Sequence, residues 1–159
     1  MDVDREGLAV VCYTDLGIIK GRVTQHDASV SSDGVVLPPA GPPMLYLVEA
    51  SLLDSQHRIV CRVREMAVNR NAILFLYEDE LAIDLGRIRS MIAREDYEAA
   101  ASEVERLLTT NQRDADLFYL AGLVYERAEA GERAHQCFRK ALEQILDDKY
   151  RAIVQHHLG

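Results

Sequence analysis

The sequence is poor in cysteine, which excludes two common ways of stabilising a small protein. The 159-residue chain has three cysteines, an odd number, at widely separated positions. This spacing matches neither a disulfide framework nor a zinc knuckle. Each cysteine lies in an apolar stretch, so we expect three small buried thiols. They are Cys12, Cys61 and Cys137.

The sequence also lacks the segments that direct a chain to or across a membrane. The acidic start shows no charged segment followed by an apolar one, which is the pattern of a secretory signal. No apolar run reaches the ~18 residues that a membrane-spanning helix needs. We therefore expect a cytoplasmic protein that does not insert into a membrane.

Positive charge is scarce. The chain has 18 Lys and Arg residues against 26 Asp and Glu residues, and its formal net charge is −8. Neither half of the chain is basic. Because the field of an acidic chain opposes a polyanion, we do not expect nucleic acid as a partner.

No catalytic arrangement of residues is apparent. None of the five histidines is spaced from an Asp, Ser or Cys as in a known nucleophilic site. The sequence has no glycine-rich phosphate loop. We therefore expect a non-enzymatic protein with no catalytic residues, no cofactor and no metal. The histidines are His26, His57, His135, His156 and His157.

The first half of the chain has the pattern of short strands. Apolar and alternating stretches are separated by turn residues, and no helical period interrupts them. A loop rich in Pro and Gly over residues 24–44 excludes helix there. This pattern favours a small antiparallel β-barrel or a strongly bent sheet. The expected strands cover residues 8–13, 18–23, 45–52, 58–64 and 72–77.

The pattern becomes helical after the acidic segment of residues 78–80. Leu81, Leu85, Ile88 and Ile92 follow at helical spacing. We therefore expect an α+β protein with two domains. A β-domain covers residues 1–79, and a helical domain covers residues 80–159.

Six residues of the second half fall on the packing positions of a helix–turn–helix repeat. Gly122 and Ala134 are small where two helices would cross closely, and three aromatic residues would fill the space around them. On these residues the segment 116–142 resembles the tetratricopeptide repeat (TPR) family. It departs from the family at Ala121 and at Glu129, where a Leu and a Gly are usual. The six are Phe118, Gly122, Tyr125, Ala134, Phe138 and Ala141.

One repeat length earlier the sequence contains a weaker copy. Ala100 occupies the small position of the second helix, but Asp84 stands where an aromatic is expected. After residue 142, the stripe of Tyr150, Ile153, Val154 and His157 resembles the capping helix of such an array. The resemblance covers about half of the chain.

The resemblance implies an array that binds a partner protein on its concave face. First-helix residues line that face, so the expected contacts are Arg89, Tyr119, Leu123 and Arg127. Tyr119 follows the core residue Phe118, so we expect its ring to point away from the helix crossing. The resulting expectation is a cytoplasmic adaptor or scaffold, with a homodimer as a further option.

The first half faintly resembles the Sm-like and SH3-like small barrels, through residues 16–23, 45–52 and 68–73. Arg58 and Arg62 match the arginine spacing of PilZ domains, but the Asp/Asn-x-Ser-x-x-Gly turn that this family needs does not follow them. Four cations would form a patch for an anionic partner if their strands were neighbours. They are Lys20, Arg22, Arg62 and Arg64.

The sequence also leaves a second function open. The chain would then be a ligand- or nucleic-acid-binding regulator that uses its β-domain, with the helical half mediating dimerisation.

Overall fold

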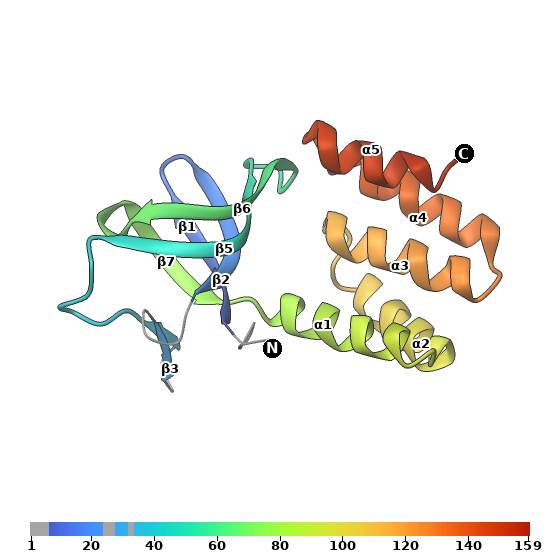
Figure 1. The fold of residues 1–159 in the computed structure, drawn as a ribbon, viewed down its shortest axis with the longest axis horizontal. Coiled ribbons are helices and arrows are strands. Elements are labelled where there is room, and N and C mark those ends of the chain that lie inside the picture. The colour runs from blue at the N-terminus through green and yellow to red at the C-terminus, as the bar shows by residue number, and fades with distance from the viewer. Residues whose placement is uncertain (1–6, 24–27, 32–33) are drawn as a thin grey trace. The chain divides into compact units, whose positions relative to one another are not determined.

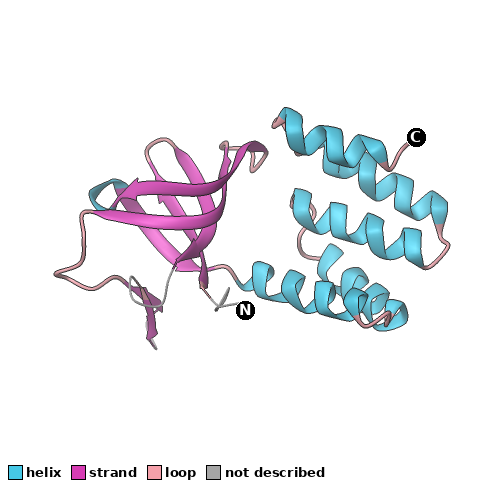
Figure 2. Cartoon of the chain, viewed as in Figure 1, coloured by secondary structure: helices cyan, strands magenta, loops and turns pink. Residues whose placement is uncertain are grey.

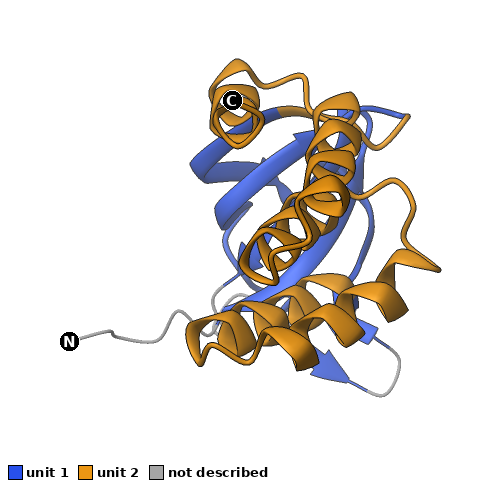
Figure 3. Ribbon diagram, turned by 90° about the vertical axis from the view of Figure 1, so that its right-hand side faces the viewer, with its two compact units in different colours: residues 1–55, 61–80 blue, residues 56–60, 81–159 orange. Residues whose placement is uncertain are grey.

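The computed structural model describes residues 7–23, 28–31 and 34–159, and it confirms a mixed α+β architecture. A five-stranded antiparallel sheet is followed along the chain by five helices (Figures 1 and 2). The chain divides into two compact units (Figure 3). Unit 1 is Met1–Ser55 with Cys61–Glu80, and unit 2 is Gln56–Val60 with Leu81–Gly159.

Unit 1 contains the sheet, whose strand order is β6-β5-β2-β1-β7. The first turn is held by Thr14, whose hydroxyl donates to Gly17 O at 3.0 Å. Gly17 has φ 143°, and a Cβ there would lie 2.6 Å from Leu53 O, so a side chain does not fit. The strands are β1 (Leu8–Thr14), β2 (Gly17–Val23), β5 (Met44–Leu53), β6 (Ile59–Asn69) and β7 (Ile73–Glu78).

The sheet is open. β6 and β7 are its two edges, and among the described residues they do not pair with each other. The expectation of a closed barrel is therefore not met; the alternative was a strongly bent sheet, and the structure shows a five-stranded antiparallel sheet. A 3-10 turn, η1 (Arg70–Ala72), connects the two edge strands.

A bulge in β5 changes which side chains face the core of unit 1. Glu49 has φ 51°, and the register with β2 shifts at this point. Leu45 and Leu47 before the bulge and Ala50 after it all belong to the buried core, whereas Tyr46 is 59% exposed. Strict alternation along this strand predicts that Tyr46 and Ala50 share a face, and the bulge makes that prediction wrong.

The segment predicted as a loop over residues 24–44 contains two short strands. β3 (Ser29–Ser31) and β4 (Gly34–Val36) form a separate two-stranded sheet, and residues 24–27 and 32–33 lie outside the described part. Arg70 holds the proline-rich end of this segment in place through hydrogen bonds to three proline carbonyls. Its guanidinium donates to Pro38 O at 2.5 Å and to Pro42 O at 3.4 Å, and its N–H donates to Pro43 O.

Unit 2 contains two helix pairs whose backbones repeat every 34 residues. The turn within each pair has a glutamate in the left-handed region, Glu95 with φ 61° and Glu129 with φ 58°. In each turn, the backbone N–H of the residue after this glutamate donates to the carbonyl oxygen five residues earlier in the chain. Asp96 N–H donates to Met91 O at 3.0 Å, and Ala130 N–H donates to Tyr125 O at 2.8 Å. Both turns are thus Schellman turns of the same geometry.

The helix bounds follow the same period, and side-chain caps mark three of the helix starts. Asp96, Asp114 and Asp147 each accept a hydrogen bond from the backbone N–H three residues further on. The helices are α1 (Glu80–Ala93), α2 (Tyr97–Leu108), α3 (Ala115–Arg127), α4 (Gly131–Glu143) and α5 (Asp148–His156).

The crossing of α3 and α4 depends on a glycine. A Cβ on Gly122 would lie 2.4 Å from Cε1 of Phe138, which is fully buried. Ala134, the other small residue of the pattern, is also buried. The prediction that Gly122 and Ala134 lie at a close helix crossing agrees with this packing.

Unit 2 also includes five residues, Gln56–Val60, from the turn after β5 and the start of β6. Ile59, which is 3% exposed, bridges to Ile145 at the turn between α4 and α5. Its N–H donates to Gln144 O at 2.8 Å, and its carbonyl accepts from Leu146 N–H at 2.7 Å. The end of the helical unit is therefore held by backbone groups from an earlier part of the chain.

Candidate functional site

The residues predicted to bind a partner lie on α1 and α3. Arg89 and Leu123 are 34 positions apart, so they occupy the same position in successive helix pairs. Arg127 follows Leu123 by one helical turn. Arg89 and Arg127 are exposed and Leu123 is half-buried. The three side chains thus belong to corresponding faces of the first helix of each pair.

Tyr119 lies in a cluster of aromatic rings. Its ring centroid is 6.0 Å from that of Phe138, 5.8 Å from Tyr150 and 5.8 Å from His157. The residue is half-buried. The expectation that this ring points away from the helix crossing is wrong, because α5 packs beside it and Phe138 reaches it from α4.

Polar contacts fix α5 against α3 around this cluster. The Tyr150 hydroxyl donates to Asp116 Oδ1 at 2.7 Å. His157 stacks on Phe138 at 4.8 Å between ring centroids, and its Nδ1 lies 3.2 Å from Glu126 Oε2. Tyr150 and Val154 of the predicted capping stripe are buried, whereas Ile153 is 53% exposed. Tyr119 therefore positions α5, and Arg89, Leu123 and Arg127 remain as the accessible part of the predicted face.

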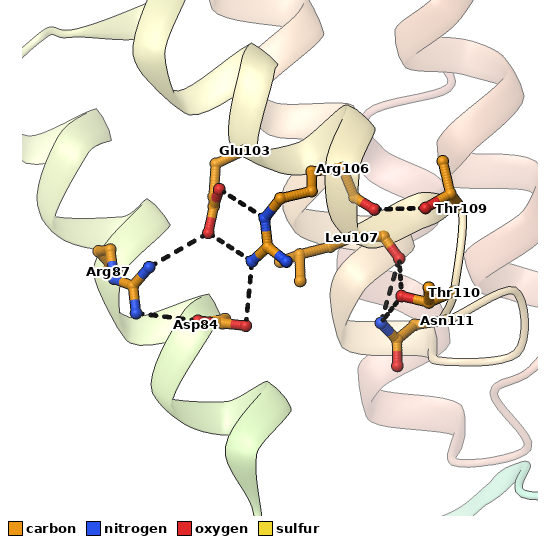
Figure 4. Close-up of polar contacts among 8 residues, drawn as sticks. All are labelled: Asp84, Arg87, Glu103, Arg106, Leu107, Thr109, Thr110 and Asn111. Carbon is orange, nitrogen blue, oxygen red and sulfur yellow. Dashed lines mark hydrogen bonds and ion pairs between the residues drawn. The ribbon is translucent and has the colours of Figure 1, made fainter.

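A network of four charged side chains joins α1 to α2 (Figure 4). Arg87 lies 3.0 Å from Asp84 and 3.3 Å from Glu103. Arg106 lies 3.3 Å from Asp84 and 2.7 Å from Glu103, and its Nε donates to Glu103 Oε2 at 2.9 Å. The hydrogen bond and charge of Arg106 hold the pKa of Glu103 below its usual range.

This network explains why the first helix pair departs from the family pattern. The position 34 residues after Asp84 is Phe118, and the position 34 residues after Arg106 is Lys140. Lys140 Nζ lies 5.4 Å from the centre of the Phe118 ring, so the same two positions make a cation–π contact in the second pair and an ion pair in the first. Apolar packing positions alone do not reveal this equivalence, because one pair uses charge where the other uses an aromatic ring.

A groove of about 450 Å³ lies between the end of α2, α3 and α4. Phe118, Tyr125 and Cys137 line it, and all three are buried. Arg133 lies over the Tyr125 ring at 5.7 Å and also contacts Glu105 at 3.0 Å. None of the residues predicted to bind a partner lines this groove. The two cations that line the groove, Arg133 and Lys140, were not predicted from the sequence as binding residues. The 34-residue spacing between Arg106 and Lys140 could have identified Lys140.

The condition stated for a patch of four cations in the β-domain, that their strands be neighbours, is not met in the sheet. β5 lies between β2, which carries Lys20 and Arg22, and β6, which carries Arg62 and Arg64. Lys20 Nζ lies 3.9 Å from Asp79, and Arg22 Nε lies 3.7 Å from Glu49. The strands are not neighbours, and both cations on β2 already face carboxylates.

The face of the sheet that carries Lys20 also carries a pair of tyrosines. The rings of Tyr13 and Tyr77 lie 5.9 Å apart, and the Tyr77 hydroxyl donates to the Tyr13 oxygen at 3.4 Å. Partial burial and this hydrogen bond raise the pKa of Tyr77 to about 12. Tyr77 is therefore a neutral phenol at physiological pH.

Over residues 7–23, 28–31 and 34–159, no three His, Cys, Asp or Glu side chains come together in a way that would hold a metal ion. No helix there has the length and apolar content required to cross a membrane.

Neither a comparison with models of known protein families nor a search of curated proteins finds a match to this chain.

Proposed function

We propose that the chain is a non-enzymatic adaptor that binds a partner protein through a TPR-like helical unit. The observation that carries the proposal is the 34-residue period of the backbone. The left-handed residues Glu95 and Glu129 and the hydrogen bonds around them recur with this spacing, which is the repeat length of the family that the sequence resembles. Arrays of this kind act by presenting a face built from equivalent positions.

The binding face is centred on Leu123 and Arg127, with Arg89 at its edge. Arg89 and Leu123 are equivalent positions of two successive first helices, and a partner that spans both pairs would contact both. An apolar side chain flanked by two exposed arginines suits an apolar surface with acidic residues beside it. Tyr119 supports this face from behind, since its ring contacts Tyr150 and His157 of α5.

For the β-domain, we propose only that its strand order resembles that of Sm-like and SH3-like folds. β1, β2, β5 and β6 follow one another as a meander, and β7 returns beside β1 after a 3-10 turn. This order supports the likeness to Sm-like and SH3-like folds. A ligand- or nucleic-acid-binding regulator that uses the β-domain remains the alternative function, although β5 separates the two strands that carry its expected cations.

The experiment captures a partner with the full chain and compares variants. We expect a protein that co-purifies with the wild-type chain from cell extract, and we then measure its Kd by calorimetry. Leu123→Glu and Arg127→Glu should each raise Kd about tenfold, which corresponds to about 1.4 kcal/mol. Arg139→Glu, at an exposed position of α4, is the matched control and should leave Kd unchanged.

A captured partner whose Kd does not respond to Leu123→Glu or Arg127→Glu would contradict the proposed face. Circular dichroism of each variant verifies that the helical content is unchanged. Tyr119→Ala is unsuitable as a test, because it removes ring contacts that hold α5.

A further inference from the structure

The two helix pairs treat one equivalent cation differently. In the first pair, Arg106 lies 3.3 Å from Asp84 and 2.7 Å from Glu103 (Figure 4). The residues 34 positions after Asp84, Glu103 and Arg106 are, in this order, Phe118, Cys137 and Lys140. The second pair therefore keeps the cation but has an aromatic ring and a thiol where the first pair has two carboxylates.

Lys140 forms no ion pair with any residue in the described part of the chain. Its side chain is exposed, and its Nζ lies 5.4 Å from the centre of the Phe118 ring. The cation–π contact holds the ammonium group beside the groove between the end of α2, α3 and α4, and it leaves the positive charge unneutralised. A carboxylate from another molecule would fill the role that Glu103 has in the first pair.

A second cation lies on the same wall of this groove. Arg133 and Lys140 are seven residues apart on α4, so they share a side of the helix and stand about 10 Å apart along it. Arg133 also pairs with Glu105 at 3.0 Å, but both side chains are more than half exposed, and such a pair contributes little. Among the lining residues that the structure describes, Glu143 is the one acid. The groove therefore favours an acidic ligand.

The length and polar lining of the groove suit an extended peptide. The wall from Arg133 to Gln144 covers about 16 Å of helix, which is the length of about five residues of extended chain. Three glutamine side chains line the groove, and their amides make no hydrogen bond to any described residue. A primary amide both donates and accepts, as the backbone of an extended peptide requires. The three are Gln112, Gln136 and Gln144.

We propose that this groove binds an extended acidic segment of a partner protein. One carboxylate of the segment lies beside Lys140, a second reaches Arg133, and an apolar side chain between them lies over Cys137. Alternate side chains of an extended chain point the same way, so two acidic residues four positions apart with an apolar residue midway match this wall. The groove is a second binding surface, because it does not include the face centred on Leu123.

The probe is a heptapeptide with blocked ends, Ser-Glu-Ser-Leu-Ser-Glu-Ser, titrated into the isotope-labelled full chain and followed by NMR. We expect the amide signals of Gln136, Cys137 and Lys140 to shift, with a Kd below about 1 mM. A peptide with glutamine in place of both glutamates should bind about tenfold more weakly or less. Lys140→Glu should raise Kd for the glutamate peptide by about tenfold. Arg139→Glu is the matched control, because Arg139 is an exposed neighbour on α4 that does not line the groove, and Kd should not change.

A charge exchange completes the test. A peptide with lysine in place of both glutamates should bind the Lys140→Glu variant more tightly than the wild-type chain, and circular dichroism verifies that this variant keeps its helices. Four results would each overturn the proposal. They are no shift up to about 1 mM glutamate peptide, a Kd that Lys140→Glu leaves unchanged, failure of the charge exchange, and equal shifts with acetate at the same concentration. The probe needs no captured partner, so this result is independent of the test of the Leu123 face.

Discussion

The same substitution should have opposite effects at two helical glycines. Gly86 lies in the interior of α1, and a Cβ there would meet no atom within 4 Å. Gly122 lies in α3, where a Cβ would be 2.4 Å from Cε1 of Phe138. Gly86→Ala should therefore stabilise the protein through helix propensity alone, by about 0.5–1 kcal/mol.

Gly122→Ala should destabilise it. The new Cβ would be roughly 1 Å closer to the Phe138 ring than the ~3.5 Å of a normal carbon contact. The ring is fully buried and stacked on His157, so it cannot retreat without moving α5. Overpacking of this kind costs about 1–3 kcal/mol, and helix propensity offsets about 1 kcal/mol of it. The net loss should be up to about 2 kcal/mol.

Thermal and urea unfolding of the full chain measure both effects. In a chain of this length, each kcal/mol shifts Tm by about 2–4 °C. We expect Tm to rise for Gly86→Ala and to fall for Gly122→Ala. If both variants shift Tm in the same direction, the helix crossing is not where Gly122 and Phe138 place it.

Three further predictions concern single residues. Glu129→Gly should stabilise the protein by about 0.5–1 kcal/mol in urea unfolding, because glycine adopts a positive φ without strain; a loss would refute the turn geometry. The lowered pKa of Glu103 stabilises the fold above its ordinary value of 4.5, and this contribution is lost as pH falls through the lowered pKa. Glu103→Gln should therefore flatten the acid side of the stability profile, and an unchanged profile would exclude the network as its cause. Cys61, which is half-buried, should react with a thiol reagent in the native protein. Cys12, whose pKa burial raises to about 12, should react only after unfolding, and rapid labelling in the native state would contradict its burial.

The packing of the second helix pair could be predicted because its signal is local and periodic. Gly122 and Phe138 lie within two consecutive helices, and the small residue has to match the large one wherever the pair packs. Glu129 departs from the family pattern, yet its backbone adopts the left-handed conformation that glycine usually supplies. The turn is therefore determined by its hydrogen bonds as well as by residue type.

The face of β5 and the order of the strands could not be predicted, for different reasons. The bulge at Glu49 depends on a positive φ at a residue that does not favour it, so alternation gave the wrong face for Tyr46. The order of the strands depends on long-range pairing, and β5 separates the two strands that carry the predicted cations.

The site was predicted only in part, for a similar reason. The sequence places Leu123 and Arg127 on the first-helix face, but the packing of α5 around Tyr119 involves residues more than 30 positions away. A short aromatic stripe does not specify which ring it will contact. Likewise, Asp84 departs from the apolar pattern because its partner Arg106 lies on the next helix.

Chemical labelling of arginines in the complex tests the central claim most directly. A dicarbonyl reagent modifies exposed guanidinium groups, and mass spectrometry measures the rate at each one. In the full chain bound to its captured partner, Arg89 and Arg127 should be protected, whereas Arg139 on α4 and Arg64 on β6 should react as in the free protein. Protection of Arg139 or Arg64 with no change at Arg127 would contradict the proposed binding face.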